Sequence, residues 1–296
     1  MKSILFSVFL FFLAFTLHAQ VLDMEYLKAM KARSIGPGGM SGRVTAIDAE
    51  PGNPAVLYIG TASGGIWKTT NGGVNFDPIF DDQDVANIGS LALDPSNKDV
   101  IWAGTGEGNP RNSLNGGRGI YKSLDGGRSW KLMGLEDTRH IHRIIVHPGN
   151  SDVVYVGAIG SPWGPHPERG VYKTTDGGKS WKQVLYVNEL TGVADMVMDP
   201  DNPQKLFVAM WEHQRWPWFF KSGGAGSGLH MTVDGGETWT LVKEGLPKGE
   251  LGRMGLAIAA GNSSYVYALV ESKKNAIYRS SDGGYTWEER GSKNMG

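Results

Sequence analysis

Four carboxylate side chains in or beside polar segments of this sequence could form a catalytic pair. Cleavage of a glycosidic bond by two carboxylates needs an acid and a base or nucleophile about 5–9.5 Å apart. A glycoside hydrolase is therefore one function that the sequence allows. The candidates for its catalytic pair are Glu107, Glu168, Asp195 and Glu212.

The same segments are rich in arginine, histidine and tryptophan, which suit ligand binding. Indole rings stack on sugars and anchor peptides, and Trp and Arg are frequent at binding hot spots. Segment 211–220 alone reads Trp-Glu-His-Gln-Arg-Trp-Pro-Trp-Phe-Phe. The alternative is that these aromatic rings only pack loops against one another. The predicted ligand-binding residues are Arg111, Asn112, Arg139, His140, His142, Trp163, Arg169, Arg215, Trp216 and Trp218.

Other chemistries have weaker support. His140 and His142 would share one side of an extended segment, but no carboxylate or cysteine pattern accompanies them. We therefore predict a polar surface pair, no metal site and no other cofactor. The chain has no cysteine, and its formal net charge is −1 with acidic and basic residues mixed. Disulfides are excluded, and nucleic acid is not expected as a partner because no basic stripe is present.

A short motif occurs five times and provides the frame in which these residues lie. It reads Ser/Thr-x-Asp-Gly-Gly-x-Ser/Thr-Trp in four copies, whereas the first copy has Asn and Phe for Asp and Trp. The glycines supply the positive φ angles of a tight turn, and the carboxylate can accept backbone N–H groups. We interpret these residues as structural, because a reaction needs one or two carboxylates and not one per repeat. They are Asn71, Asp125, Asp176, Asp234 and Asp282, with Trp130, Trp181, Trp239 and Trp287.

The motif recurs about every 50 residues, which indicates a repeat architecture. Each period holds an alternating strand, a Pro/Gly/Asn turn, an apolar strand, a short strand leading into the motif and a strand leaving it. This order predicts an all-β protein, a β-propeller of four-stranded antiparallel blades with Asp-box hairpins. Two alternatives remain open: a closed ring of five blades, or part of a larger propeller in a longer chain with further C-terminal domains.

The connections of the expected blades differ in length between the two ends of the propeller. Strand alternation places the first–second and third–fourth connections at one end, and these are short turns and Asp boxes. The second–third connections lie at the other end and are long: Thr105–Arg118, Ala158–Arg169 and Met210–Ser227. We therefore expect the ligand-binding face at the long-loop end.

The N-terminus has the pattern of a cleavable signal peptide. Lys2 precedes an apolar run from Ile4 to Leu17, and Ala19 offers a cleavage site. The run is too short to span a bilayer, and no later segment is long and apolar enough. We expect a signal peptide at 1–19, a lead-in segment at 20–33 and the propeller at 34–296, in a secreted or periplasmic protein without a transmembrane segment.

From Ser34 to Arg290 the repeats resemble the BNR/Asp-box propellers, in particular the sortilin-like (Vps10-type) propellers of bacterial exported proteins. More distantly they resemble the xyloglucanase-type glycoside hydrolases. Those hydrolases carry a catalytic aspartate after the second strand of an early blade, and the matching segment Gly60–Gly65 has no acid. The Trp- and Arg-rich loops, together with this missing acid, favour a non-catalytic binding module for a peptide or polysaccharide. A glycoside hydrolase acting on a plant or microbial polysaccharide is the alternative.

Overall fold

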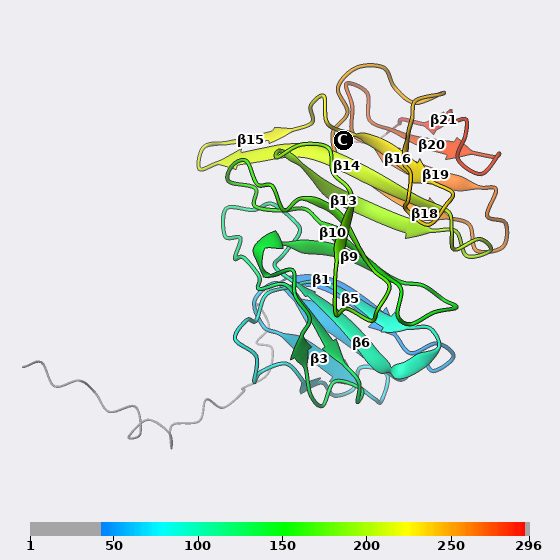
Figure 1. Ribbon diagram of the computed structural model, residues 1–296. Coiled ribbons are helices and arrows are strands. Elements are labelled where there is room, and N and C mark those ends of the chain that lie inside the picture. The colour runs from blue at the N-terminus through cyan, green and yellow to red at the C-terminus, as the bar shows by residue number, and fades with distance from the viewer. Residues whose placement is uncertain (1–42, 294–296) are drawn as a thin grey trace, which may run out of the picture. The chain divides into compact units, whose positions relative to one another are not determined.

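The computed structural model describes residues 43–293, which form five antiparallel sheets (Figure 1). The expected signal peptide and lead-in segment lie outside the described residues. Among the described residues the helical structure is one short 3-10 turn, η2 (Glu136–Thr138). No helix in this part of the chain is long and apolar enough to cross a membrane. The predicted all-β propeller fold is confirmed.

Each sheet is one blade, and four of its strands pair side by side in chain order. The inner strands of successive blades contact one another in the series β1, β5, β9, β13, β18. The strands are, in blade 1, β1 Val44–Ala49, β2 Leu57–Thr61, β3 Ile66–Thr69 and β4 Asp77–Pro78; in blade 2, β5 Ile88–Asp94, β6 Asn97–Thr105, β7 Ile120–Ser123 and β8 Lys131–Leu132; in blade 3, β9 Ile141–Val146, β10 Val154–Ala158, β11 Gly170–Thr174 and β12 Lys182–Leu185; in blade 4, β13 Thr191–Met198, β14 Leu206–Trp216, β15 Phe219–Ser222, β16 Gly228–Thr232 and β17 Thr240–Val242; in blade 5, β18 Met254–Ile258, β19 Val266–Val270, β20 Ala276–Ser280 and β21 Glu288–Gly291.

Glycines in the second strands let neighbouring blades pack closely. A Cβ atom on Gly60 would lie 2.6 Å from the side chain of Ile88 on the next inner strand. Gly104 has the same relation to Ile141, at 2.4 Å. The branched side chains of one blade therefore fill the space that these glycines leave in the blade before it, and they contribute to a core without voids.

The Asp boxes are closed hydrogen-bonded turns, as in blade 3. Thr174 donates its hydroxyl proton to Asp176 Oδ1 at 2.7 Å and accepts the Gly178 N–H at 3.0 Å. Asp176 also accepts the Ser180 N–H at 3.0 Å and its hydroxyl proton at 2.5 Å. In blade 2, the equivalent bonds, led by that from the Ser129 hydroxyl, lower the pKa of Asp125 to about 2. The oxygens of these carboxylates accept hydrogen bonds from within their own turn.

Side chains of one blade also contact the Asp box of the blade that follows it. The ammonium groups of Lys68, Lys122 and Lys173 donate to the carbonyl of the first box glycine in the next blade, at 2.9, 3.3 and 2.8 Å. A second-strand aromatic ring packs on the second box glycine. A Cβ on Gly178 would lie 2.6 Å from Trp102, and one on Gly284 would lie 2.2 Å from Phe207. The box thus links blades as well as closing its own turn.

One predicted loop is a β-hairpin. The sequence placed Met210–Ser227 in a long connection, but β14 continues to Trp216 and pairs with β15 as far as His213↔Ser222. Its tip is the pair Trp216↔Phe219, with two residues between them. Figure 1 shows the β14–β15 hairpin extending away from the rest of blade 4. The prediction was wrong here because aromatic residues with high strand propensity were assigned to a loop on the basis of their position alone.

Candidate functional site

The loop between β6 and β7 of blade 2 is bonded to blades 4 and 5 at the long-loop end. Arg253 Nη1 donates to Asn109 Oδ1 at 2.9 Å. Arg215 Nη1 donates to Asn112 Oδ1 at 2.5 Å, and its Nε donates to the Pro110 carbonyl at 3.1 Å. Three hydrogen bonds to Asn109, Pro110 and Asn112 hold this loop against side chains more than 100 residues away in the chain.

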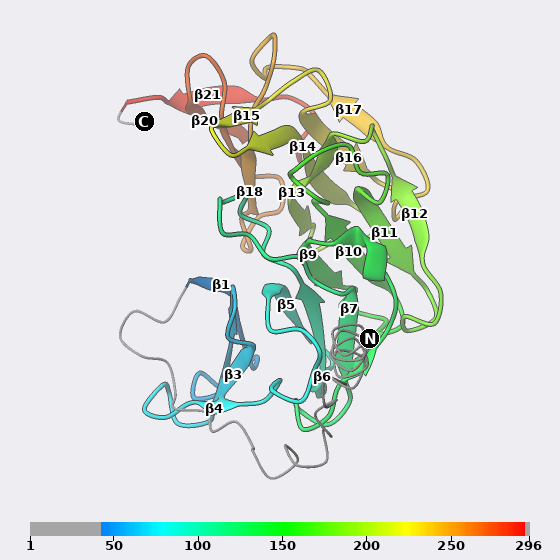
Figure 2. The ribbon, with the colours of Figure 1, turned by 90° about the vertical axis from the view of Figure 1, so that its left-hand side faces the viewer.

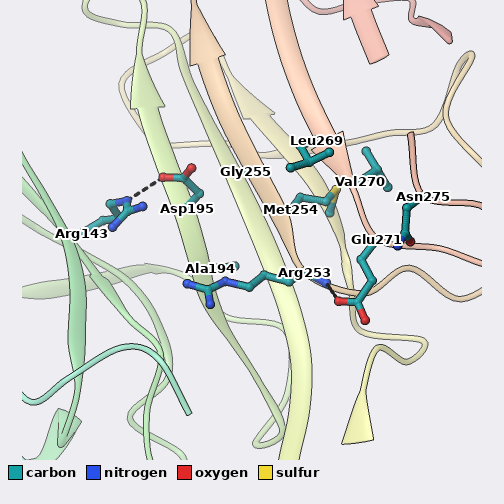
Figure 3. A pocket seen from close by; sticks show the side chains of 10 residues that line it. All are labelled: Arg143, Ala194, Asp195, Arg253, Met254, Gly255, Leu269, Val270, Glu271 and Asn275. Carbon is teal, nitrogen blue, oxygen red and sulfur yellow. Dashed lines mark hydrogen bonds and ion pairs between the residues drawn. The ribbon is translucent and has the colours of Figure 1, made fainter. Parts of the chain in front are cut away.

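Two cavities share lining residues near this loop, and the loop itself lines one of them. The first has a volume of about 460 Å³ and is shown in Figure 3. The second has a volume of about 520 Å³ and is lined by residues of the blade 2 loop and the β14–β15 hairpin. Arg253 and Glu271 line both cavities. The remaining lining residues are, in the first, Arg143, Ala194, Asp195, Met254, Gly255, Leu269, Val270 and Asn275, and in the second, Arg43, Asn109, Pro110, Arg111, Trp211, Phe220 and Ser222.

Arg253 is a fixed cation where the two cavities meet. Its guanidinium lies over the Trp211 ring at 5.3 Å from the centroid, and its Nη2 is 2.9 Å from His142 Nε2. Its backbone N–H donates to Glu271 Oε2 at 2.8 Å, and Glu271 also accepts the Ser222 hydroxyl proton at 2.7 Å. Burial lowers the pKa of Arg253. The sequence analysis missed both Arg253 and Glu271.

Each of the four candidate catalytic carboxylates has a partner. Glu107 is buried and accepts two hydrogen bonds from the guanidinium of Arg43, at 2.8 and 2.5 Å. Asp195 bonds Arg143 Nε at 2.6 Å and also accepts the backbone N–H of Leu256 at 2.8 Å. These two acids therefore join neighbouring blades of the propeller.

The other two candidates bond within their own blades. Glu168 accepts the Tyr172 hydroxyl proton at 2.8 Å, and Glu212 pairs with Lys221 at 2.8 Å. Burial acts to raise the pKa of Glu212, but the bonds from Lys221 and the Gly226 N–H outweigh it, so that pKa is lowered. A general acid that works near neutral pH needs a raised pKa. Glu212 has the opposite shift.

His140 and His142 are not the polar surface pair that the sequence predicted. His140 directly precedes the inner strand β9 and is only 3% exposed, and His142 lies in that strand and is only 4% exposed. The blade 2 loop covers them: a Cβ on Gly108 would lie 2.0 Å from His142 Nδ1. Desolvation lowers the pKa of His140 to about 4 and that of His142 well below its usual value. Both rings are therefore neutral at physiological pH.

Arg169 is also inside the protein. It is fully buried, and its guanidinium donates to the Ser161 carbonyl at 2.5 Å and to the Leu190 carbonyl at 3.0 Å. Burial lowers its pKa to about 10. Its bonds tie the blade 3 loop to the link that enters blade 4. This arginine holds loops together and does not reach the surface.

The tip of the β14–β15 hairpin presents exposed aromatic rings. Trp218 is 82% exposed and Phe219 is 57% exposed. Trp216 is partly buried, and its ring centroid lies 6.0 Å from that of Phe219. Trp163, on the blade 3 loop, is 43% exposed. The two segments are joined, because the Arg215 N–H donates to the Pro162 carbonyl at 2.7 Å.

The other predicted binding residues surround these features. Arg111 is exposed and lines the second cavity. Asn112 is exposed and accepts from Arg215, whose guanidinium also lies 4.7 Å from the Phe220 ring centroid. Arg139 is exposed and follows the short turn η2. The part of the chain that the structure describes contains no cluster of three or more His, Asp or Glu side chains suited to a metal ion.

The arrangement has three layers of function. Arg253 and Glu271 line both cavities, the blade 2 loop lines the second, and the buried histidines and Arg169 lie beneath or between the loops. The exposed hairpin tip directly precedes Phe220, which lines the second cavity. Exposed flat rings beside a cavity that holds fixed cations can contact a sugar or a peptide chain.

Comparison with known proteins finds a family-model match in the central part of the chain and solved structures that share the fold over most of it. Residues 118–253 match the model of the Sortilin-Vps10 family, described as sortilin, neurotensin receptor 3. No curated protein matches the chain in sequence.

Three solved structures share the fold. A GH74 enzyme from Niastella koreensis is 23% identical, with a TM-score of 0.64, over 83% of this chain and 38% of that one. An ancestral GH74 enzyme is 21% identical, with a TM-score of 0.63, over 84% of this chain and 31% of its own. The GH74 xyloglucanase from Xanthomonas campestris is 17% identical, with a TM-score of 0.52, over 87% and 46%. The chain thus spans less than half the length of these proteins.

Proposed function

We propose that this chain, a sortilin-like β-propeller built from Asp-box repeats, is a non-catalytic binding module. Its ligand is a peptide or a glycan, held at the long-loop end by the aromatic hairpin tip and the adjoining cavities. The observation that carries the proposal is that Trp218 is 82% exposed and Phe219 is 57% exposed at the hairpin tip, where neither ring packs into a core. Large aromatic rings exposed together mark interaction sites.

The surroundings of the tip support a binding role. Arg215 fixes the hairpin to the blade 2 loop through Asn112 and Pro110. A hairpin that is already held in place loses little conformational freedom when a ligand binds, which favours affinity. Arg111 and Arg253 line the neighbouring cavity and suit carboxylate or hydroxyl groups of a ligand.

The pairing of the candidate acids supports a role without catalysis. Glu107, Asp195 and Glu212 each bond to a basic side chain at 2.8 Å or less. A hydrolase needs one carboxyl group with a raised pKa as its general acid. The pKa of Glu212 is lowered instead, because burial, which acts to raise it, is outweighed by the hydrogen bonds that this carboxylate accepts, first among them that from Lys221. In addition, segment Gly60–Gly65 has no acid where xyloglucanases carry a catalytic aspartate.

We also propose that the protein acts outside the cytoplasm, as a secreted or periplasmic protein. The support is the signal-peptide pattern of residues 1–19. N-terminal sequencing of the exported protein is the test, and we expect it to begin at Gln20.

The binding proposal is tested by screening the purified chain on a polysaccharide array that includes xyloglucan and on a peptide array. We expect binding to one ligand class, weakened about tenfold or more by Trp218→Ala. Tyr285→Ala is the matched control, because Tyr285 is 55% exposed but lies in the Asp box of blade 5. Binding that both variants retain in full would overturn the proposal.

A glycoside hydrolase is the second candidate, and one observation favours it. Asp195 and Glu271 line the same cavity, which could bind a sugar between two carboxylates. In Figure 3, however, the two carboxylate groups do not point toward each other. Release of reducing sugar from xyloglucan distinguishes the two functions. Turnover that is abolished by Asp195→Asn and by Glu271→Gln, or by Glu107→Gln or Glu212→Gln, would establish the hydrolase.

A further inference from the structure

Alternation along the β14–β15 hairpin shows which backbone groups of β15 are free. Hydrogen-bonded and non-hydrogen-bonded pairs alternate between antiparallel strands. The Gly223 N–H donates to a carbonyl of β14 at 2.9 Å, so Ser222 and Phe220 stand in the non-hydrogen-bonded pairs. Their partners His213 and Arg215 agree with this, because both donate their N–H groups to carbonyls outside the hairpin. The N–H and C=O groups of Phe220 and Ser222 therefore point away from β14.

These four groups form an open strand edge. None of them has a hydrogen-bond partner among residues 43–293. Blade 4 lies between blades 3 and 5 in the arc of blades that Figure 2 shows, so the blades that flank this edge are both in place. Phe220 and Ser222 are only partly buried. An open edge of this kind is a template on which one more strand can pair.

The chain itself pairs with this side of the hairpin at one neighbouring position. Gly224 and Leu251, which lies in the link to blade 5, form an isolated antiparallel bridge. The Gly224 N–H donates to the Leu251 carbonyl at 3.3 Å. The bridge does not extend to Ser222. A segment can therefore approach this side of the hairpin in antiparallel orientation, and the positions of Ser222 and Phe220 are left unfilled.

Two cavities border the open edge and provide room for a ligand. Phe220 and Ser222 line the second cavity, of about 520 Å³. Ser222 also lines a third cavity, of about 620 Å³, with Gly223 and with segments 247–252 and 271–274. Ser222 is fixed in this position, because its hydroxyl accepts the Trp211 indole N–H at 3.0 Å and donates to Glu271 at 2.7 Å. A chain that pairs with the edge would thus meet open space and not packed side chains.

The side chains that line these two cavities are mainly basic. Three arginines and three lysines line them, against two glutamates. Arg111, Lys248 and Lys273 are exposed, and their side chains have no ion pair or hydrogen bond among the described residues. Arg253 adds a fixed guanidinium at the second cavity. Cations without an acid beside them favour an anionic partner, because opposite charges across an interface attract.

We propose that an extended acidic peptide binds to β15 as an additional antiparallel strand. Its backbone pairs with the N–H and C=O groups of Phe220 and Ser222. Its acidic side chains lie on the face that these two residues share, where they enter the cavity lined by Arg111 and Arg253. Main-chain bonds then give affinity, and alternate side chains give specificity. The peptide is the ligand of the proposed binding module, so this inference rests on that function and limits its ligand to one class.

The test is fluorescence anisotropy of the purified chain with labelled peptides of about eight residues. The acidic peptide alternates valine with glutamate, which favours a strand and places every carboxylate on one face. A peptide that alternates valine with lysine is the charge-reversed control. We expect the acidic peptide to bind and the lysine peptide to bind about tenfold more weakly or less.

Backbone methylation of the acidic peptide tests strand pairing directly. In the proposed antiparallel pairing, the residues opposite Phe220 and Ser222 are glutamates, and their N–H groups face β15. N-methylation of the glutamates should therefore weaken binding about tenfold or more, because it removes these donors. N-methylation of the valines is the matched control and should leave binding unchanged, since those N–H groups point away from β15.

A substitution in the protein tests the position of the peptide. Arg111→Glu should weaken the acidic peptide about tenfold or more and strengthen the lysine peptide. Arg111 is exposed, so we expect the variant to fold with unchanged circular dichroism. Lys179→Glu is the matched control, because Lys179 is exposed in the Asp box of blade 3 and should not affect either peptide.

The results that would overturn the proposal are distinct from a failure of the binding function. Equal binding of the two methylated peptides would exclude strand addition, and equal binding of the acidic and lysine peptides would exclude an acidic ligand. Unchanged binding in Arg111→Glu would place the peptide elsewhere. If no peptide binds but a glycan on the array does, the peptide is wrong and the binding module stands. If nothing binds in either assay, both proposals fail.

Discussion

The Asp-box end and the long-loop end of this propeller are built in different ways. At the Asp-box end the same turn recurs, and the side-chain Oδ1 of the Asp or Asn accepts the backbone N–H four residues later in every box. At the long-loop end no two connections are alike. Buried polar atoms without a hydrogen-bond partner among the described residues occur at both ends, for example Nδ1 of His140 and of His142 at the long-loop end and Nε1 of Trp239 in the Asp box of blade 4.

This difference indicates that one end of the propeller stabilises the fold and that the other end is available for function. A turn that satisfies its polar groups locally can be repeated in every blade without regard to its neighbours. The connections at the long-loop end differ from blade to blade, and loops held on a regular scaffold are where binding residues are commonly found. The long-loop end is thus where we place ligand binding, and the Asp-box end is the scaffold.

The largest expected effect is that of acid on the long-loop end. Desolvation lowers the pKa of His140 to about 4 and that of His213 to about 3, so the folded state binds their protons less well than the unfolded state. Their contribution to stability is complete above pH of about 6.5 and is lost as pH falls toward those values. We expect a loss on the order of 3 kcal/mol from His140 alone.

Hydrogen exchange against pH shows whether the two ends respond separately. The pKa of Asp125 is held at about 2 by its hydrogen bonds, first that from Ser129. Its contribution is therefore kept down to pH of about 3.9 and lost below that value. Between pH 6.5 and 4, segments 105–118 and 139–142 should exchange faster while the Asp boxes stay protected. Equal loss of protection at both ends would contradict the comparison.

The next largest effect is expected at the Asp-box end. Gly284→Ala would place a methyl group 2.2 Å from the Phe207 ring at a residue with φ of 96°. Overpacking and backbone strain together should lower the free energy of unfolding by about 3 kcal/mol. Gly249→Ala is the matched control, because Gly249 has φ of 102° but no atom within 4 Å of its added Cβ. We expect about 1 kcal/mol for the control, measured by urea denaturation. Equal losses of unfolding free energy in the two variants would show that the contact between Gly284 and Phe207 contributes nothing to stability.

A smaller effect is expected from Asn109→Ala. This change removes the acceptor of Arg253 Nη1 and should cost about 1–2 kcal/mol, because the bond is charge-assisted and partly buried. It should also accelerate hydrogen exchange in segment 105–118. Asn262→Ala, in an exposed turn of blade 5, is the control and should cost about 0.5 kcal/mol or less. If hydrogen exchange in segment 105–118 is unchanged in the Asn109 variant, the bonds from Arg215 alone hold the loop.

The smallest effect on stability is expected from Trp218→Ala. The ring is 82% exposed, so its removal should change the free energy of unfolding by about 0.5 kcal/mol or less. Thermal unfolding monitored by circular dichroism is the measurement. A loss of several kcal/mol would mean that the ring packs on the protein and is not kept for a ligand.

The repeats made the fold predictable, because each Asp box marks the same turn and local patterns define the strands on either side. Burial at the long-loop end was not predictable in this way. His142 is covered by Gly108 and bonded by Arg253, and no local pattern links these three residues. The position of Glu271 in its blade, by contrast, was recognisable from the sequence. It directly follows a second strand, at the end where Glu107 also lies, and comparing all five strand ends would have revealed it.

The most direct test of the central claim compares Trp218→Ala with Trp181→Ala in both binding and thermal unfolding. Trp181 donates its indole N–H to the Met133 carbonyl at 2.7 Å and packs edge-on against Trp102 at the Asp-box end. With the ligand found on the arrays, we predict that Trp218→Ala loses binding at an unchanged melting temperature. Trp181→Ala should lower the melting temperature and bind normally while folded. Binding lost only in the Trp181 variant would contradict the account.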